Sequence, residues 1–434
     1  MNYVDELLDF TNEGVTAFHV VSNISEKLKN NGFLELIEGE DWDVKYGGKY
    51  FVTRNDSSVI AFKIPQKECG GFNIAAAHSD APTFKLKPEY EMSKNQNYIS
   101  LNIEGYGGML CATWLDRPLS VAGRIIAQTQ NGIEARLVKL DRDIALIPSV
   151  AIHMDRKANS GHEYKMNVDM LPLIGSDTSK NKLEELLAKT AGIDAEALIG
   201  HDLYLYNRMK SCVWGADDEY ISASKLDDLQ CAYSILRAFI DTEDINNISV
   251  CCVFDNEEVG SLTMQGASST FLYDTLKRTV VAMGKSEVDY QKMIASSFMV
   301  SADNAHAMHP NYPELSDVKN AVLMNKGVVI KTNASQKYAT DAISMAIFKK
   351  ICDRARVPYQ MYANRSDMAG GSTLGNLSNA QVSLRMVDIG LAQLAMHSAY
   401  ETAGVKDTEY LINAMAEFYR TTVKYNGNNM YTLI

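Results

Sequence analysis

The sequence predicts an α/β fold in which a central mixed sheet is flanked by helices and interrupted by a β-rich insertion. Helical and strand patterns alternate at both ends of the chain, as where the amphipathic run Leu226–Ile240 is followed by the apolar run Ile248–Phe254. Between about residues 86 and 216 the pattern changes to short alternating runs separated by glycine and proline. We therefore predict one α/β domain from residues 1–86 and 217–434, and an inserted β-rich domain from residues 87–216.

Each element is predicted from its own apolar pattern. Residues 3–32 have helical spacing, and residues 45–63 alternate and turn like a hairpin around Tyr46-Gly47-Gly48. Helices are also predicted at Leu226–Ile240, at Tyr338–Ile351 and, within the insertion, near Lys180–Leu198. Strands are predicted at Phe72–Asp80, Ile248–Phe254, Phe298–Ala302, Pro358–Tyr362 and Val382–Met386.

Composition excludes several classes of partner and location. The 434 residues carry a formal net charge of −12, which argues against nucleic acid or an anionic membrane as the main partner. No run approaches the roughly 18 apolar residues of a membrane span. The first ten residues lack the basic and apolar segments of a signal peptide. The seven cysteines are scattered without a Cys-x-x-Cys pair, so we expect a reducing, cytoplasmic setting.

The most informative residues are two adjacent carboxylates, Glu257 and Glu258. They follow the apolar run that ends at Phe254, so a buried strand leads directly to them. Ligands of open α/β sheets bind at the carboxyl edge of the strands. Two like charges held together there require a compensating cation, and a divalent metal is the natural one. One glutamate would then ligate the metal while the other transfers protons.

Other metal-type ligands stand at the remaining predicted strand ends and helix starts. They are His78 with Asp80, Asp227 with Asp228, Asp303, and His397. Ser398-x-x-Glu401 is a capping-box pattern, which predicts that His397 lies just outside a helix amino terminus. A structural histidine, an ordinary helix cap or a solvated turn would explain any one of these sites alone. Their repetition favours a metal centre, and imidazole with carboxylate suits zinc or manganese better than calcium.

Longer strings around these residues carry a family resemblance. They are similar to the M18 metallopeptidases, the aspartyl aminopeptidase family of co-catalytic dizinc exopeptidases, from about residue 10 to 430. The strings are Ala77-His78-Ser79-Asp80, Tyr106-Gly107-Gly108, Trp114-Leu115-Asp116-Arg117-Pro118-Leu119, Asp255-Asn256-Glu257-Glu258-Val259-Gly260-Ser261, Ser301-Ala302-Asp303-Asn304-Ala305-His306-Ala307-Met308-His309-Pro310-Asn311-Tyr312 and Leu394-Ala395-Met396-His397-Ser398. The resemblance implies a zinc exopeptidase-like α/β fold and an aminopeptidase that uses two divalent metal ions per subunit.

The resemblance also implies a role for each residue of the site. One metal would be held by His78 and Asp303, the other by Glu258 and His397, and Asp227 would bridge them. Asp80 is spaced to hydrogen-bond the far nitrogen of His78 and so fix its tautomer. Glu257 would be the general base and acid. Zinc is the expected metal, with cobalt or manganese as alternatives because they share these ligands.

Specificity for acidic first residues is a further implication of the resemblance. A buried cation would pair with the carboxylate of the substrate side chain. Lys331, at the end of the apolar run Val328–Lys331, matches the family position for this role. A surface lysine at a strand end is the alternative, and Lys337 and Tyr338 are secondary candidates. If Lys331 has no such role, a neutral or broad first-residue preference would be expected.

Three further histidines have open roles. His153, in the insertion, resembles a family histidine that completes the active site of a neighbouring subunit near the substrate carbonyl. A direct metal ligand and a packing histidine are the alternatives for it. His306 and His309 flank Asp303 and are expected to be structural. The Gly-rich loop Ser366–Gly375 is expected to shape the substrate pocket, because no P-loop lysine follows it.

The family assembles into homo-oligomers, typically dodecamers built from dimers through the inserted domain. The resemblance therefore implies peptide substrates and an insertion that serves as a dimerisation domain, with neither nucleic acid nor membrane as partner. A non-catalytic scaffold on the same fold is a remote alternative. The presence of Glu257 together with every metal ligand argues against it.

Overall fold

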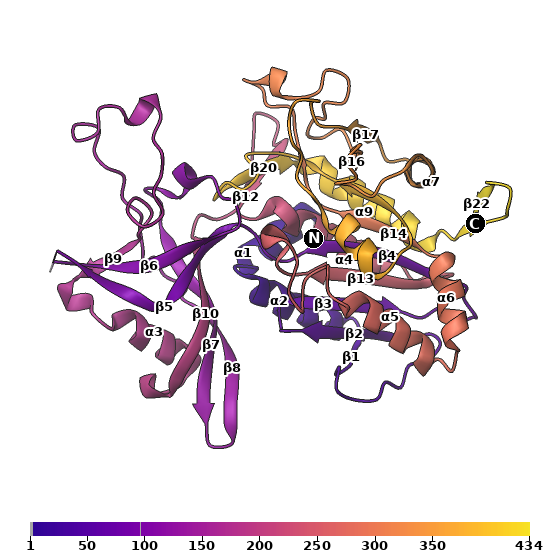
Figure 1. Ribbon diagram of the computed structural model, residues 1–434, viewed down its shortest axis with the longest axis horizontal. Coiled ribbons are helices and arrows are strands. Elements are labelled where there is room, and N and C mark those ends of the chain that lie inside the picture. Colours follow the sequence, from indigo (N-terminus) through magenta and orange to yellow (C-terminus); the bar gives the residue numbers. More distant parts are fainter. Residues whose placement is uncertain (1–2, 96) are drawn as a thin grey trace.

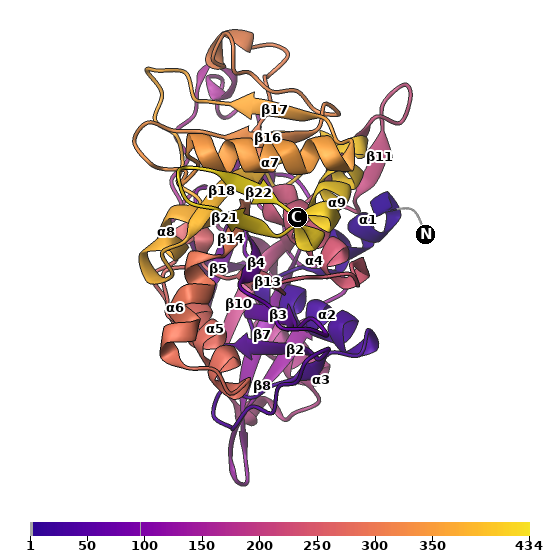
Figure 2. The ribbon, with the colours of Figure 1, turned by 90° about the vertical axis from the view of Figure 1, so that its right-hand side faces the viewer.

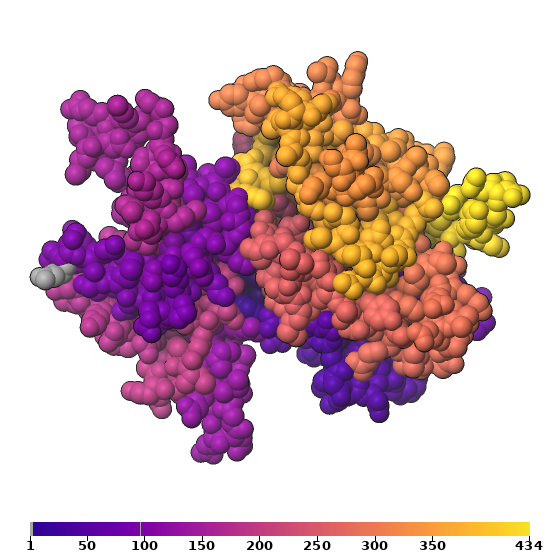
Figure 3. Space-filling model, viewed as in Figure 1, coloured from indigo at the N-terminus to yellow at the C-terminus, as the bar shows by residue number. Residues whose placement is uncertain are grey.

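The computed structural model describes residues 3–95 and 97–434 and has a mixed α/β architecture. Figure 1 shows a large sheet with helices on both of its faces, and beside it a second sheet with its own helix. Figure 3 shows that the inserted residues form a separate lobe next to the rest of the chain. The predicted fold class, a mixed sheet flanked by helices with a β-rich insertion, is confirmed.

The large sheet is mixed, and Figure 2 shows its strands in order from β17 at the top to β2 near the bottom. Its central strands β13, β4, β14 and β18 are parallel, so their carboxyl ends meet at one edge. Antiparallel pairs flank them on both sides. The full order is β1 (Leu34–Glu35), β2 (Lys49–Arg54), β3 (Ser58–Lys63), β13 (Ile248–Phe254), β4 (Phe72–His78), β14 (Phe298–Ala302), β18 (Arg385–Gly390), β16 (Val328–Lys331) and β17 (Tyr359–Tyr362).

Helices cover both faces of this sheet because both faces of its central strands are apolar. Val250 and Cys252 of β13 pack into one core, while Cys251 and Val253 pack into the other. The helices of one face are α1 (Tyr3–Glu13), α2 (Ala17–Asn30), α4 (Leu226–Asp241), α7 (Ala342–Ala355) and α9 (Val405–Arg420). Those of the other face are α5 (Phe271–Ala282), α6 (Glu287–Ala295) and α8 (Leu374–Gln381).

The insertion forms an antiparallel six-stranded sheet with a core of its own. Its strands, in spatial order, are β8 (Gly132–Lys139), β7 (Leu119–Thr129), β10 (Leu198–Asn207), β5 (Thr83–Lys94), β6 (Tyr98–Tyr106) and β9 (Leu173–Ser176). Helix α3 (Lys182–Ala191) packs against it through Leu183 and Leu187. Tyr106, the last residue of β6, donates a hydrogen bond to Asp80, which lies just after β4 of the large sheet. The insertion therefore contacts the large sheet at this point.

A smaller five-stranded sheet joins segments that lie far apart in the chain. It contains β11 (Cys212–Trp214), β12 (Tyr220–Ala223), β20 (Glu401–Gly404), β19 (Ala392–Leu394) and β15 (Ala305–His306), and a separate hairpin pairs β21 (Val423–Tyr425) with β22 (Tyr431–Leu433). Strands β12, β15 and β19 adjoin Asp227, Asp303 and His397 in sequence. This sheet therefore brings the segments that carry these three residues side by side.

Several predicted element boundaries differ from the structure. The helical run 3–32 is two helices, separated by residues 14–16. Helix α7 begins at Ala342 rather than at Tyr338, because the Asp341 side chain caps it by accepting a hydrogen bond from the Ser344 amide. The strand predicted at Val382–Met386 is β18, Arg385–Gly390. Among the described residues, no helix has the length and apolarity to cross a membrane.

Candidate metal centre and active site

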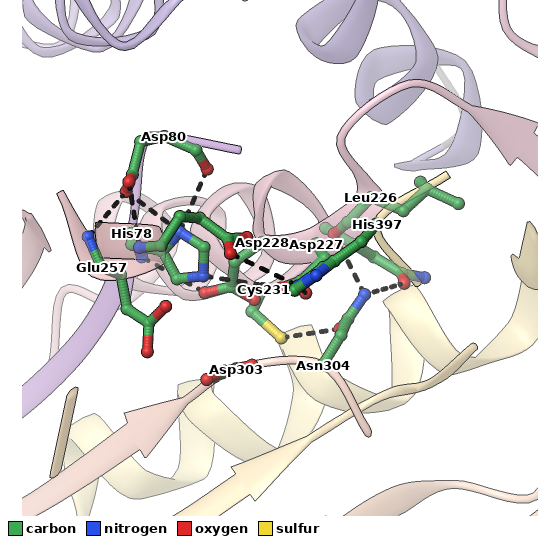
Figure 4. Close-up of polar contacts among 12 residues, drawn as sticks. His78, Asp80, Leu226, Asp227, Asp228, Cys231, Glu257, Asp303, Asn304 and His397 are labelled. Carbon is green, nitrogen blue, oxygen red and sulfur yellow. Dashed lines mark hydrogen bonds and ion pairs between the residues drawn. The ribbon is translucent and has the colours of Figure 1, made fainter. Parts of the chain in front are cut away.

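The candidate centre lies at the carboxyl edge of the large sheet (Figure 4). His78 is the last residue of β4, and Asp303 directly follows β14. Glu257 and Glu258 follow β13 after Asp255 and Asn256. Because parallel strands end at the same edge, residues far apart in the sequence become neighbours there.

Asp227 lies between two groups of candidate ligands. Ligand atoms of His78, Asp227 and Asp303 lie within 4.8 Å of one another, and so do those of Asp227, Glu258 and His397. His78 Nε2 is 3.4 Å from Asp227 Oδ1, and His397 Nε2 is 3.5 Å from Asp227 Oδ2. The two oxygens of one carboxylate thus face the two imidazoles. Asp227 and Asp228 have non-helical backbone angles at the start of α4, and the peptide bond between them is cis.

The donor atoms have the spacing and the unmet bonding capacity that a cation requires. Two donors that each lie about 2.0–2.1 Å from a tetrahedral zinc ion are about 3.3–3.4 Å apart. His397 Nε2 is 3.3 Å from Glu258 Oε2, close to this separation. The other oxygen of Glu258, Oε1, is buried and has no hydrogen-bond partner among the described residues. The residues present therefore fit divalent metal ions.

The Nδ1 atoms of both imidazoles point away from Asp227, and each contacts an oxygen atom of another residue. His78 Nδ1 is 3.3 Å from Asp80 Oδ1 and 3.1 Å from the Asp80 carbonyl oxygen. His397 Nδ1 donates to the carbonyl oxygen of Gly108 at 2.8 Å. A proton on each Nδ1 leaves the lone pair of each Nε2 directed at the centre.

Asp80 also holds the acidic turn that follows β13. Its Oδ1 accepts the Glu257 amide at 3.1 Å and its Oδ2 accepts the Glu258 amide at 3.2 Å. Burial raises the pKa of Glu257 to about 8 in the absence of metal, and burial likewise raises the pKa of Glu258. The turn thus concentrates buried carboxyl groups whose charged forms need a nearby cation.

One sequence prediction in this region is wrong. Ser398-x-x-Glu401 does not begin a helix, because Glu401 is the first residue of β20 and pairs with Ala223 of β12. The Glu401 carboxylate instead accepts hydrogen bonds from the backbone amides of His397, at 2.7 Å, and Asp227, at 2.9 Å. It therefore ties together the backbones of two candidate ligands. A capping box within one helix and this long-range bridge use the same residue types, so the pattern alone does not distinguish them.

Lys331 lies beside the centre and is 2% exposed. Its ammonium donates to the carbonyl oxygen of Asn304 at 2.8 Å and lies 3.4 Å from Asp303 Oδ1. Although burial by itself lowers the pKa of Lys331, the neighbouring Asp303 carboxylate raises it above the ordinary value. The lysine is thus a buried, charged group that contacts a candidate ligand.

His153 lies away from this group of residues. It is exposed in a loop of the insertion, and no described contact joins it to the carboxyl edge of the large sheet. Figure 1 shows this magenta loop projecting from the six-stranded sheet, clear of the large sheet. Within one chain, the structure therefore does not bring His153 to the candidate centre.

A cavity of about 330 Å³ opens beside His397. Its wall includes His306, His309, Gln393 and Met396, together with the Gly-rich loop at residues 368–370. The histidines that flank Asp303 in sequence thus line a space next to the candidate centre rather than pack in the core. None of the candidate ligands lines this cavity, but Met396 of its wall directly precedes His397.

Sequence reasoning missed the residues that orient the candidate ligands. These are Tyr106, which donates to Asp80 Oδ2 at 2.7 Å, the Gly108 carbonyl, Asn304 and Glu401. The Asn304 amide donates to the Leu226 carbonyl at 3.0 Å and so joins the segments that carry Asp303 and Asp227. The string Tyr106-Gly107-Gly108 was a sequence signal, but the contact of Gly108 with His397 spans 289 residues and no local pattern encodes it.

Comparison with known proteins decides the family. Residues 10–419 match the family described as "Aminopeptidase I zinc metalloprotease (M18)". The chain belongs to the M18 family. A "Probable M18 family aminopeptidase 2" of Clostridium acetobutylicum is 42% identical over 427 residues, covering 96% of this chain and 99% of that protein. A protein of the same name from Pseudomonas aeruginosa is 37% identical and covers 96% of this chain and 97% of its own length.

Solved structures agree with this M18 assignment. A chain of the "Cryo-EM structure of the Ape4 and Nbr1 complex" superposes with a TM-score of 0.93 at 36% identity, covering 96% of this chain and 85% of that one. Yeast aminopeptidase 1 superposes with a TM-score of 0.84 at 28% identity, covering 96% of this chain and 97% of that one. This M18 protein is therefore a metalloaminopeptidase, a hydrolase of a zinc-dependent family.

Proposed function

We propose that this M18 aminopeptidase holds two divalent metal ions per subunit, with zinc as the metal, and removes the first residue of peptides. His78 and Asp303 would hold one ion, Glu258 and His397 the other, and Asp227 would bridge them. The observation that carries the proposal is the position of Asp227, whose two carboxylate oxygens face the two imidazoles. When bound, the ions supply Lewis acidity, which lowers the pKa of water and stabilises the oxyanion of the tetrahedral intermediate.

The protein's own residues transfer the proton and orient the two imidazoles. We assign Glu257 as the general base that takes a proton from the attacking water and returns it to the leaving amine. Its amide is held by Asp80, and the residue is half-buried beside the candidate ligands. Asp80 and the Gly108 carbonyl keep His78 and His397 in the tautomers that expose their Nε2 atoms.

Lys331 is the candidate for recognition of an acidic first residue, through its ammonium and the substrate carboxylate. Its burial next to the centre supports a functional role rather than that of a surface lysine. One observation favours the alternative, a neutral or broad preference. Lys331 already contacts Asp303 at 3.4 Å, so its charge has a partner before a substrate arrives.

We further propose that residues 87–216 mediate assembly into a homo-oligomer, a dodecamer built from dimers. One related structure is described as the "Structure of S. cerevesiae mApe1 dodecamer". The loop around His153 exposes apolar side chains, with Val150 at 59%, Ile152 at 47% and Met154 at 83%. Exposed apolar groups of this kind favour burial against another subunit. In such an assembly His153 would reach the centre of a neighbour.

Elemental analysis of the purified protein tests the proposal most directly. We expect about two zinc ions per chain, removable by a chelator together with activity on aminoacyl-peptide substrates. Restoration of activity by added zinc would follow. One ion per chain in a fully active enzyme would contradict the two-metal arrangement, and none would contradict the metal site as a whole.

A further inference from the structure

A turn of the insertion contacts both imidazoles of the proposed centre, one of them through Asp80. This Tyr106–Gly108 turn begins at the last residue of β6, a strand of the six-stranded sheet and not of the sheet that carries most of the candidate ligands. Its first residue donates from the hydroxyl to Asp80 Oδ2 at 2.7 Å. Its last residue accepts the Nδ1 proton of His397 at 2.8 Å. The Leu110 amide also donates to the His397 carbonyl oxygen at 3.0 Å.

The direction of the Tyr106 hydrogen bond is fixed by Asn256. Thr263 Oγ1 and Gln265 Nε2 both donate to Asn256 Oδ1, so the other end of this amide is its NH₂ group. That NH₂ group donates to the Tyr106 hydroxyl oxygen at 2.9 Å. The single hydroxyl proton of Tyr106 is therefore free to point at Asp80.

Asp80 links Tyr106 to the residues of the proposed centre. It is 4% exposed, and its two oxygens also accept the amides of Glu257 and Glu258. Its Oδ1 faces His78 Nδ1. Figure 4 shows Asp80 beside both His78 and the Glu257 backbone. A shift of this one carboxylate would thus move a metal-ligating imidazole and the glutamate turn together.

The Tyr106 hydroxyl is suited to a fixed donor role. Burial, together with the Asp80 charge, raises the pKa of Tyr106 well above its usual value, so the hydroxyl keeps its proton. The ring is held edge-on by Tyr204 of β10, with 5.7 Å between centroids. Both rings belong to the insertion, whose sheet is stiffened by long β5–β6 and β7–β10 pairings.

We propose that Tyr106 is a positioning residue through which the inserted domain sets metal affinity in the neighbouring α/β domain. It acts through Asp80 on His78 and on the Glu257–Glu258 turn, while the Gly108 carbonyl fixes His397. This inference rests on the proposed two-metal site. It assigns a role in the metal centre of the same chain to a domain otherwise assigned to assembly.

The test compares Tyr106→Phe with Tyr204→Phe. Both changes remove one hydroxyl from adjacent rings of the same sheet, but the Tyr204 hydroxyl makes no hydrogen bond within the described part of the chain. Zinc-loaded proteins are titrated with a chelating dye of known affinity. We expect Tyr106→Phe to bind zinc about 10- to 100-fold more weakly, the usual loss when a group that orients a ligand is removed. Tyr204→Phe should match the wild type.

A double-mutant cycle with Asp80→Asn shows whether the effect passes through Asp80. Tyr106→Phe should weaken zinc binding much less in the Asp80→Asn background than in the wild type. Equal losses in both backgrounds, equal losses for Tyr106→Phe and Tyr204→Phe, or unchanged affinity in Tyr106→Phe would overturn the inference. If the wild type itself binds no zinc, the proposed function fails, and with it the basis of this inference.

Discussion

The Nδ1 atom of His397 lies 2.8 Å from the carbonyl oxygen of Gly108, which precedes it by 289 residues. A carbonyl oxygen only accepts, so this contact places a proton on Nδ1, and in the neutral imidazole the lone pair is then on Nε2. Nε2 lies within 3.5 Å of both Asp227 and Glu258. One backbone carbonyl from the insertion thus orients a candidate ligand of the α/β domain.

The adjacent glutamates should give different phenotypes when each is changed to glutamine. Glu257→Gln should keep both metals and lower kcat by about 10²–10⁴-fold, because a proton-transfer group is lost while its shape remains. Glu258→Gln should lower metal occupancy, since a neutral amide is a weaker ligand than a carboxylate. Elemental analysis and steady-state kinetics on the same samples provide the comparison. Retained turnover in Glu257→Gln would refute its assignment as the base.

Lys331→Ala distinguishes substrate recognition from support of Asp303. If Lys331 pairs with the substrate, kcat/KM should fall about 10- to 100-fold more for amino-terminal Asp or Glu than for Leu or Ala. The neutral substrates serve as the internal control for damage to the centre. Equal losses on all substrates, together with reduced zinc content, would show that the Asp303 contact is the main role of Lys331.

Charges placed in the exposed loop of the insertion should separate the subunits. Val150→Asp with Met154→Asp puts two carboxylates where a partner would bury apolar surface, which strongly disfavours association. Sedimentation should show smaller particles that remain folded and metal-loaded but have low activity. The same change at Val281, which is 56% exposed on α5, serves as the control. A fully active monomer would exclude the action of His153 on a neighbouring subunit.

Alanine substitutions at two glycines of the insertion, Gly107 and Gly192, test how closely the Tyr106–Gly108 turn packs against the centre. Gly107 and Gly192 have similar positive φ angles, 72° and 68°. A Cβ at residue 107 would lie 3.1 Å from Glu258 Cβ, whereas one at residue 192 would meet no atom within 4 Å. Alanine at either site should lower the free energy of unfolding by about 1–2 kcal/mol through its backbone conformation. Only Gly107→Ala should also weaken zinc binding, as measured by chelator competition.

If zinc binding is weakened in both glycine variants, the cause is general destabilisation and not a clash at the centre. Unchanged binding in Gly107→Ala would show that the turn adapts to the added methyl group. Thermal unfolding of the metal-free proteins separates the backbone contribution from the effect on the centre.

Much of the architecture follows from local sequence patterns. The apolar runs before His78, Glu257 and Asp303 mark strands β4, β13 and β14, and the structure confirms that these strands are buried and central. Their side chains alternate between two apolar faces, so they require helices on both sides. The change to short alternating runs likewise marks the insertion. Boundaries such as the start of α7 depended on a single capping side chain, Asp341, and were less predictable.

Most candidate ligands were recognisable from sequence, but their support was not. His78, Glu258 and Asp303 follow predicted strands, and Asp227 stands at a predicted helix start, whereas His397 was placed beside a helix that the structure does not contain. Glu401 is an example of the support. Its spacing from Ser398 is typical of a helix cap, yet it begins a strand and binds the amides of His397 and Asp227. The pairing of β20 with β12 prevents the helix, and this pairing joins residues about 180 positions apart. Local propensity does not encode such a contact.

The sequence by itself determined which residue types stand at the ends of the central strands, and hence the identity of Glu257 and of the candidate ligands His78, Glu258 and Asp303. Only the tertiary structure decided how these residues are oriented. Asp227 lies between two imidazoles, and Asp80 accepts the amides of the glutamate turn. From the insertion, Tyr106 donates to Asp80 and the Gly108 carbonyl accepts from His397. The physical reason is the range of the interactions. Strand and helix patterns arise from neighbours a few residues apart, whereas the orientation of a buried imidazole or carboxylate depends on hydrogen bonds from distant segments that the completed fold brings into contact.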